Sequence, residues 1–171
     1  IDFKYYRDQL NFPIIENGEK SVALNLSRTI TSKISKSGLA SLTAEELELM
    51  PPSFQLGRDS YRDRFMDAAG AHCKVPENCF AAQSAWDDTM AWQATEFINK
   101  HADQILVIIV GDFHVQYGGG LPDRIKARSP NTQVLTVSQI WAEGMSDEEL
   151  KQAIQPSFVE GPRADFIWVS K

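Results

Sequence analysis

An aspartate, a histidine and a tyrosine follow the most strand-like segment of the chain. Residues 105–110 form a short, continuous apolar run rich in β-branched side chains, which is typical of a strand buried on both faces of a parallel sheet. Asp112, His114 and Tyr117 come directly after it, so we expect them at the carboxyl end of that strand, where open α/β sheets bind ligands. Imidazole and phenolate are ligands of iron. The segment is therefore suited to iron, haem or a divalent ion, unless it is simply a polar loop rich in glycine.

Two further groups contain side chains that could assist such a site. Trp86 and Met90 have the spacing of a buried helix face, whereas Asp87 either complements the helix dipole or points into a cleft towards His114. Arg28 follows a second apolar run, residues 21–25. Its guanidinium could hold a carboxylate through paired hydrogen bonds, or it could belong to a solvated capping turn.

The remaining histidines and the two cysteines give weaker signals. His101 stands near the end of a helical pattern, where a positive charge is favourable, and we assign it a structural role. His72 lies in an expected loop, where it could be anything from a solvated residue to a haem ligand. Next to it, Cys73 and Cys79 are close enough for a local disulfide, with two reduced thiols as the alternative. Zinc is disfavoured because no second pair of ligands is visible.

The elements that must position these residues alternate between helical and strand patterns. The helices are expected at about residues 26–37, 43–50, 59–69, 80–101 and from 121, with another starting at Ser146, and the strands at 21–25, 105–110, 133–137 and 165–169. Thr43 with Glu46, and Ser146 with Glu149, have capping-box spacing. Residues 70–78 are expected to be a loop. This order predicts an α/β fold with a parallel or mixed sheet and helices packed on it.

Composition limits the class of protein. The chain has 171 residues, 43% hydrophobic content and a net charge of −6, which fits a single domain over residues 1–171 and argues against a nucleic-acid partner, because phosphate binding needs clustered Lys and Arg. No apolar run approaches the roughly 20 residues that a spanning helix needs.

Four segments, taken together, resemble the ChaN-like haem-binding uptake family of the Tiki superfamily. They are residues 22–28, 38–42, 82–91 and 110–114, the last followed by Gly120, Leu121 and Pro122. The resemblance covers about residues 21–128. It implies a fold with a helical insertion and two Gly-x-x-His motifs. Only the second motif, residues 111–114, is visible, so the resemblance implies that an N-terminal part of the domain is missing. Asp112 stands where the family usually has Asn.

The resemblance also implies a function and a set of ligands. It implies an extracytoplasmic protein of haem and iron uptake, periplasmic or attached to the outer membrane as a lipoprotein, and served by an outer-membrane receptor or uptake complex. A homodimer would enclose two stacked haems, with a tyrosine of one subunit on the iron and a histidine of the other near the propionates. The candidates are Tyr61 or Tyr117 for the tyrosine, His114 and then His72 for the histidine, Arg28, Arg58 or Arg62 for the propionates, and Phe54, Phe65 and Met66 for the apolar wall. Tyr5 and Tyr6 lie outside the region of resemblance.

Two other functions compete with haem binding. Tiki relatives include metalloproteases, so a metal-dependent hydrolase is the enzyme alternative, with His114 on Mn, Co or Zn and Asp87 or Asp112 assisting a bound water. Such a site needs at least three protein ligands, and His114 is the single histidine in a suitable place. The third possibility is a non-catalytic module of a larger uptake complex. We expect a binding protein rather than an enzyme.

Overall fold

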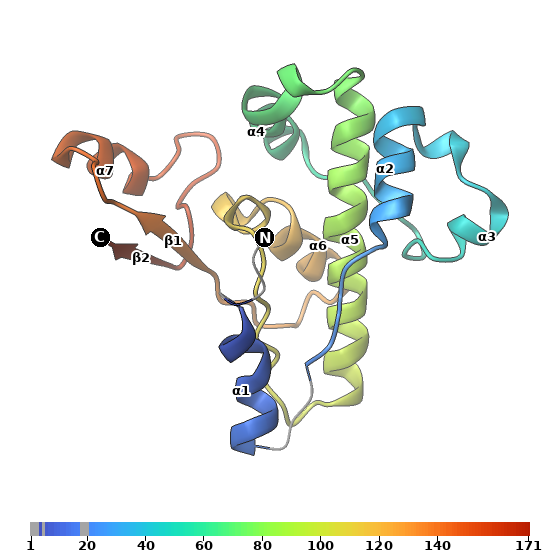
Figure 1. Ribbon diagram of the computed structural model, residues 1–171, viewed down its shortest axis with the longest axis horizontal. Helices are drawn as coiled ribbons and strands as arrows, with labels where there is room; N and C mark the ends of the chain where they lie inside the picture. The colour runs from blue at the N-terminus through green and yellow to red at the C-terminus, as the bar shows by residue number, and fades with distance from the viewer. Residues whose placement is uncertain (1–3, 5, 18–20) are drawn as a thin grey trace.

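A long central helix, α5 (Pro76–Lys100), organises the fold (Figure 1). The computed structural model describes residues 4, 6–17 and 21–171. Helices α2 and α6 pack against α5, and α4 contacts its first half. The other elements are α1 (Arg7–Asn17), α2 (Arg28–Ser37), α3 (Ala44–Leu47), α4 (Asp59–Ala69), α6 (Leu121–Arg128), α7 (Asp147–Ile154) and short 3-10 helices at Leu39–Ser41, Gly70–His72, Asp112–His114 and Gln116–Gly118. Helix α1 was not predicted from the sequence.

Local signals set the helix ends. Both predicted capping boxes are present, Thr43 with Glu46 at α3 and Ser146 with Glu149 at α7, so two backbone N–H groups at each helix start are satisfied by side chains. Helix α2 ends at Gly38, whose φ of +81° lies in the left-handed region that favours glycine. Helix α4 spans the predicted residues.

The start of α5 corrects one prediction. Residues 70–78 were expected to be a loop, but Gly70–His72 forms a 3-10 turn and α5 begins at Pro76. Proline is favourable there, because its ring fixes φ near the helical value and the first turn needs no N–H donor.

The sheet is smaller than predicted. Strand β1 (Val137–Trp141) pairs in parallel with β2 (Phe166–Ser170), with Val137 opposite Phe166, and α7 lies between them in sequence, as parallel strands require a crossover connection. The predicted strand at 165–169 is confirmed within one residue. The strand predicted at 133–137 is wrong, because pairing starts at Val137 and continues to Trp141. The α/β class is confirmed.

Residues 105–110 contradict the prediction of a strand buried on both faces. The segment forms no strand within the described part of the chain. Ile105, Val107 and Ile109 are 92%, 78% and 59% exposed, whereas Leu106, Ile108 and Val110 pack against the α5 and α6 core. One face therefore has a packing partner and the other has none, because no described strand lies beside the segment. Residues 21–25, also predicted to be a strand, form no strand with any described part of the chain.

Three groups of buried side chains hold the helices on α5. Small residues on α5, such as Ala85 and Ala91, are fully buried and let α2 and α6 approach its backbone closely. Phe80 packs with Tyr61 and Phe65 of α4. Together these contacts fix α4 and α5 around the segment that follows residue 110. The full clusters are Leu26, Ile30, Ile34, Leu42, Met50, Ala81, Ala82 and Ala85; Met90, Ala91, Ala94, Leu121 and Ile125; and Tyr61, Phe65 and Phe80.

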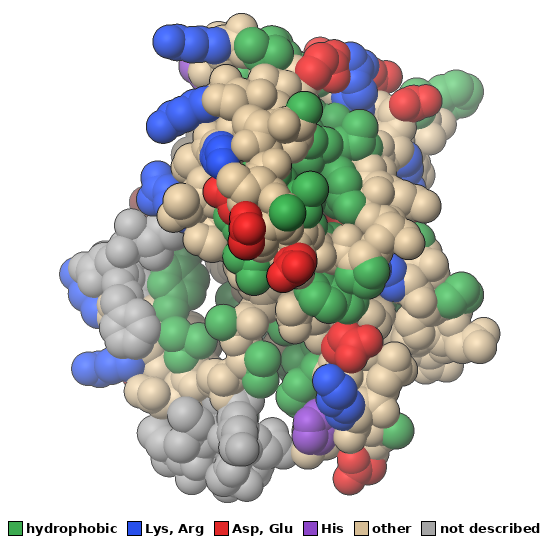
Figure 2. Space-filling view, turned by 90° about the vertical axis from the view of Figure 1, so that its right-hand side faces the viewer, with side chains coloured by type: hydrophobic (Ala, Val, Ile, Leu, Met, Phe, Trp, Pro, Cys, Tyr) green, Lys and Arg blue, Asp and Glu red, His purple; other side chains and the backbone are tan. Residues whose placement is uncertain are grey.

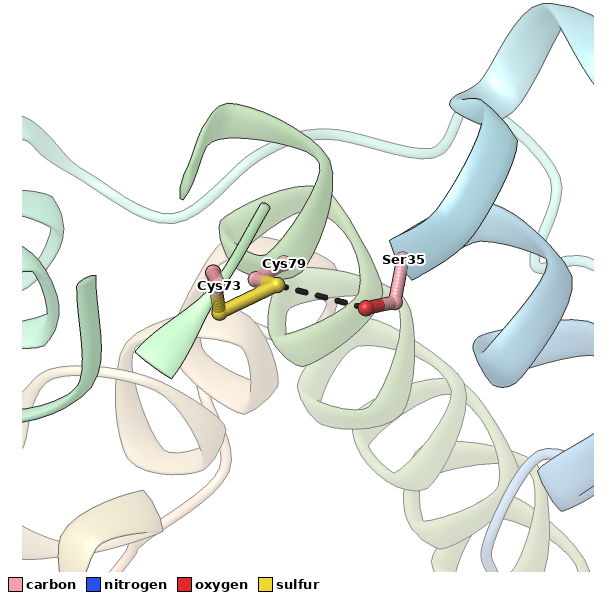
Figure 3. Close-up of a disulfide and its surroundings, with 3 residues drawn as sticks. All are labelled: Ser35, Cys73 and Cys79. Carbon is pink, nitrogen blue, oxygen red and sulfur yellow. Dashed lines mark hydrogen bonds between the residues drawn. A yellow bond between two sulfur atoms is a disulfide. The ribbon is translucent and has the colours of Figure 1, made fainter. Parts of the chain in front are cut away.

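Cys73 and Cys79 form a disulfide that ties the turn after α4 to the first turn of α5 (Figure 3). The hydroxyl of Ser35, on α2, lies 3.2 Å from the sulfur of Cys79. The sequence left open whether the two cysteines form a disulfide or are reduced thiols, and in the structure they form the disulfide. The disulfide joins two segments, and the Ser35 contact brings α2 against the same sulfur.

The surface beyond α3 carries exposed apolar side chains. Leu47, Leu49 and Leu56 are each about half exposed, and on the face viewed in Figure 2 hydrophobic side chains lie between charged ones. None of the described helices combines the length and the apolar character that a membrane-crossing helix needs.

Candidate functional site

His114 and Asp87 meet at the centre of the candidate site. His114 ends the 3-10 helix Asp112–His114, and its Nδ1 lies 2.6 Å from Oδ1 of Asp87 on α5. The Asp87 side chain is 1% exposed. The sequence left open whether Asp87 pointed towards His114 or served the helix dipole, and the structure shows the former. The Trp86 ring also lies 6.5 Å from the imidazole, edge to face.

Tyr61 and Gln83 complete a buried polar network around Asp87. The Tyr61 hydroxyl donates to Oδ2 of Asp87 at 2.8 Å, and Nε2 of Gln83 donates to the Tyr61 oxygen at 2.9 Å. Burial raises the pKa of Asp87 above its ordinary value, while the hydrogen bonds from His114 and Tyr61 oppose that rise. Burial and the charge of Asp87 raise the pKa of Tyr61 far above 10. Tyr61 is therefore a buried neutral donor.

A cavity of about 370 Å³ lies beside His114. Its walls are largely apolar, and Gln83, Asp112 and His114 bring polar groups to it. The volume is within the range of small-molecule sites, roughly 300–1,000 Å³, and the mixture of an apolar wall with few polar groups is typical of them. The lining residues are Phe65, Ala68, Ala69, Gln83, Gly111, Asp112, Phe113 and His114. Of the predicted apolar wall, Phe65 lines this cavity.

Asp112 is committed to a different set of partners. Its carboxylate accepts hydrogen bonds from Ser138 at 2.6 Å, from Arg163 at 2.6 Å and from Gln116. Burial favours a higher pKa for Asp112, but these three donors hold its pKa below the ordinary value. The residue therefore joins the His114 segment to β1 and to the loop before β2.

Tyr117 lines a second cavity, of about 350 Å³, together with Arg64 and Glu160. The Arg64 guanidinium lies about 5 Å from the ring centres of Tyr61, Phe113 and Tyr117, and such cation–π contacts hold the ring of an aromatic residue in place. Tyr117 and His114 thus face separate cavities, and the structure does not bring them into one pocket.

The other predicted ligands lie away from the cavity beside His114. His72 and Arg28 are exposed and line neither cavity. Arg58 donates to the carbonyl oxygen of Tyr117 at 2.6 Å, and Arg62 pairs with Glu77. His101, expected to be structural, stacks on Phe97 with ring centres 4.5 Å apart. Of the predicted residues, the structure brings His114, Asp87 and Tyr61 together.

Sequence reasoning gave no role to Gln83 or Gly120. Gln83 precedes Asp87 by four residues, so the two share a helix face, which is a usable signal. Gly120 packs against the network: a Cβ there would stand 3.1 Å from Asp87 Oδ1. A glycine is needed at this position because of residues that lie far from it in the sequence, so no local pattern predicts its role.

The metal alternative lacks its ligand set among the residues described. No three His, Cys, Asp or Glu side chains converge there. Asp87 is bound by His114 and Tyr61, and Asp112 by Arg163. A catalytic zinc site needs three protein ligands and an open position.

A family model described as "Haem-binding uptake, Tiki superfamily, ChaN" matches residues 1–125. The match begins earlier than the resemblance first seen near Ser21, so Tyr5 and Tyr6 fall within the matched region and their exclusion was wrong. Tyr5 lies outside the described residues, and Tyr6 is 43% exposed. No curated protein and no solved structure matches the chain.

Proposed function

Because the chain belongs to the haem-binding uptake family of the Tiki superfamily described as ChaN, we propose that it binds haem in the cavity beside His114. The observation that carries this proposal is the contact between Nδ1 of His114 and Asp87. A histidine that ligates a metal usually gives its other ring N–H to a carboxylate or carbonyl. Among the described residues none hydrogen-bonds Nε2 of His114, so that nitrogen is available as a ligand.

The residues around the cavity fit a porphyrin. Phe65 and Phe113 supply aromatic surface, and Ala68 and Ala69 leave room beside it. When bound, haem would supply iron, and Nε2 of His114 is the nitrogen that would hold it. The protein's part is to present Nε2, to cover an apolar macrocycle and to exclude water from one of its faces. Of the polar side chains at the cavity, Gln83 donates to Tyr61 and Asp112 accepts from Arg163, so neither is left without a partner.

This assignment departs from the ligation that the resemblance implies, a tyrosine on the iron and a histidine near the propionates, and it changes the roles of the two tyrosines. We propose that Tyr61 acts through Asp87 rather than on iron, because its buried hydroxyl already donates a hydrogen bond and its raised pKa disfavours the phenolate. Tyr117 stays the candidate for a phenolate ligand offered to a second subunit. The homodimer with stacked haems, and a receptor or uptake complex as partner, enter the proposal from the family resemblance.

We place the protein outside the cytoplasm. Membership of an uptake family supports this location, and so does the disulfide between Cys73 and Cys79, because such bonds persist in oxidising compartments and are rare in the cytosol. A lipid anchor at the outer membrane is the form of attachment that the resemblance implies.

Hemin titration followed by the Soret absorbance tests the function. We expect the parent protein to bind saturably, and His114→Ala to weaken binding at least about 10-fold, because loss of a ligand should cost no less than the roughly 10- to 100-fold that loss of a group supporting a ligand costs. His101→Ala is the matched control, because His101 lies at the far end of α5. Equal affinity of the parent and His114→Ala would overturn the assignment. Sedimentation with and without hemin tests the dimer, which should increase with haem.

A further inference from the structure

The loop between α7 and β2 buries an acid and exposes a phenylalanine. Ser157 and Gly161 close it through a pair of backbone hydrogen bonds, of 2.7 and 2.9 Å. Phe158 and Val159, at the tip of this turn, are exposed to solvent, whereas the side chain of Glu160 is 8% exposed. A buried carboxylate beside an exposed aromatic residue reverses the usual distribution, so the position of Glu160 requires a specific cause.

Two arginines surround the Glu160 carboxylate without forming hydrogen bonds to it. Nη2 of Arg58, just before α4, lies 3.5 Å from Oε1 of Glu160, and Nε of Arg64, on α4, lies 3.4 Å from Oε2. Oε1 of Glu160 and both Nε and Nη2 of Arg64 are buried without a hydrogen-bond partner among the described residues. A buried ion pair is stabilising only when its hydrogen bonds are well formed, so little free energy opposes replacement of Glu160 by another carboxylate.

One edge of the Arg64 guanidinium matches a carboxylate. Its Nη1 donates to the carbonyl oxygen of Gln116 at 3.1 Å, and three aromatic rings, with centres 4.9 to 5.3 Å away, hold the group in place. Nε and Nη2 form the other edge, from which a carboxylate can accept two parallel hydrogen bonds. Gly119 makes this position possible, because a Cβ there would lie 2.9 Å from Nη2.

The second cavity, of about 350 Å³, adjoins these groups and is lined by both Arg64 and Glu160. Its volume suits a small molecule. Three of its lining residues carry hydroxyl groups, namely Ser60, Tyr117 and Ser157. Asp63 and Asp67 also line it, but both are exposed, so water and salt screen their charges. The interior end of the cavity is therefore cationic once Glu160 leaves it.

We propose that Arg58 and Arg64 bind the carboxylate of a small organic acid, and that Glu160 occupies their site in the free protein until the acid displaces it. The chain itself places a carboxylate there, and the cavity offers hydroxyl groups to the rest of the acid. Displacement releases the loop, so that binding and loop opening are linked. The site lies outside the cavity beside His114 and does not depend on the proposed haem binding.

Calorimetric titration with citrate tests this proposal. Glu160→Gln should bind citrate at least about tenfold more tightly than the parent, because the neutral amide no longer competes for the arginines. Asp67→Asn is the matched control, since it removes an exposed carboxylate from the same cavity. Its affinity should stay within about threefold of the parent's, because exposed charges interact weakly. No gain in Glu160→Gln, or an equal gain in both variants, overturns the proposal.

Hydrogen exchange of the parent gives a second test that needs no variant. Citrate should speed the exchange of amides at residues 157–163, because the loop loses its anchor, whereas a ligand that simply fills the cavity would slow it. Unchanged or slower exchange at these residues contradicts displacement of Glu160.

The carboxylate of a free acid and a propionate of haem share this chemistry, and hemin separates the two sources. If a propionate occupies the site, hemin should speed exchange at residues 157–163, its dimethyl ester should not, and citrate should compete with hemin. If a free acid occupies it, hemin should leave both the exchange and the citrate titration unchanged. A parent that binds citrate as expected but gives no Soret band would overturn the proposed function alone, so the two failures are distinguishable.

Discussion

A Cβ atom on Gly120 would stand 2.8 Å from the carbonyl oxygen of His114. It would also lie 3.0 Å from the hydroxyl of Tyr61 and 3.1 Å from Asp87 Oδ1. Gly120 has φ of +68°, in the region that favours glycine. The buried network of Tyr61, Asp87 and His114 therefore leaves no room for a side chain at position 120.

Gly120→Ala should destabilise the fold by about 3 kcal/mol, because backbone strain and overpacking each cost about 1–3 kcal/mol. Gly144→Ala is the control: Gly144 also has positive φ, +80°, but nothing lies within 4 Å of its Cβ position. It should lose only about 1 kcal/mol. Urea denaturation measures both values, and equal losses would show that the close approach at Gly120 has no energetic weight.

The disulfide should stabilise the protein by constraining the unfolded chain. Cys73 and Cys79 are separated by 6 residues in sequence, and a loop of that length gives about 2 kcal/mol by chain entropy. The double variant Cys73→Ser with Cys79→Ser should lose that amount in urea denaturation. Reductant should lower the stability of the parent and leave the double variant unchanged. An equal response of both proteins to reductant would contradict this role.

The ion pair between Asp88 and Arg128 should depend on both partners. Two hydrogen bonds of 2.6 Å join them, and Asp88 is 1% exposed. Arg128→Met should cost about 3–5 kcal/mol, because it leaves a buried carboxylate without its cation. Asp88→Leu combined with Arg128→Met should cost less than Arg128→Met alone. A double variant that is less stable than the single one would show that the charge itself is not the cause.

Asp165 should make stability depend on acid pH. Its carboxylate accepts hydrogen bonds from the hydroxyl and the backbone N–H of Thr136, both at 2.7 Å, and these lower its pKa in the folded protein. A lowered pKa means that the contribution is present above the unfolded value, about 3.9, and is lost as pH falls through the folded pKa. The difference in Tm between the parent and Asp165→Asn should therefore be largest near pH 7 and should vanish in strong acid.

Asp103→Asn, at an exposed position, is the control for this comparison. Its difference in Tm from the parent should stay small at each pH. A gap between the parent and Asp165→Asn that is unchanged from pH 7 to pH 3 would show that the Thr136 hydrogen bonds do not favour the ionised carboxylate.

Local signals in the sequence predicted most of the helices, although α1 and the first turn of α5 were missed. Capping boxes at Thr43 and Ser146, and the glycine at position 38, act within one or two turns, so their effect is visible in the sequence. The strands were predicted less well. Residues 105–110 have strand composition, yet burial on both faces depends on neighbouring strands, which no local pattern supplies.

The candidate site shows the same division. The sequence placed His114 after an apolar segment, where ligand groups collect. It also suggested the contact with Asp87 that the structure contains. The sequence did not show which of Tyr61 and Tyr117 is the better candidate for the ligating tyrosine, since both are aromatic residues in suitable segments. Burial and hydrogen bonding distinguish them, with Tyr61 inside the network and Tyr117 in the second cavity. Those are properties of contacts between distant parts of the chain.

The most direct test is pulsed electron paramagnetic resonance of ferric haem bound to protein that carries ¹⁵N only in histidine. The chain has 3 histidines, and the porphyrin contributes ¹⁴N, so a ¹⁵N coupling reports a histidine on the iron. We predict this coupling in the parent and in His72→Ala, and its loss in His114→Ala. A parent protein without the coupling, or a coupling that survives in His114→Ala, would contradict the assignment of His114.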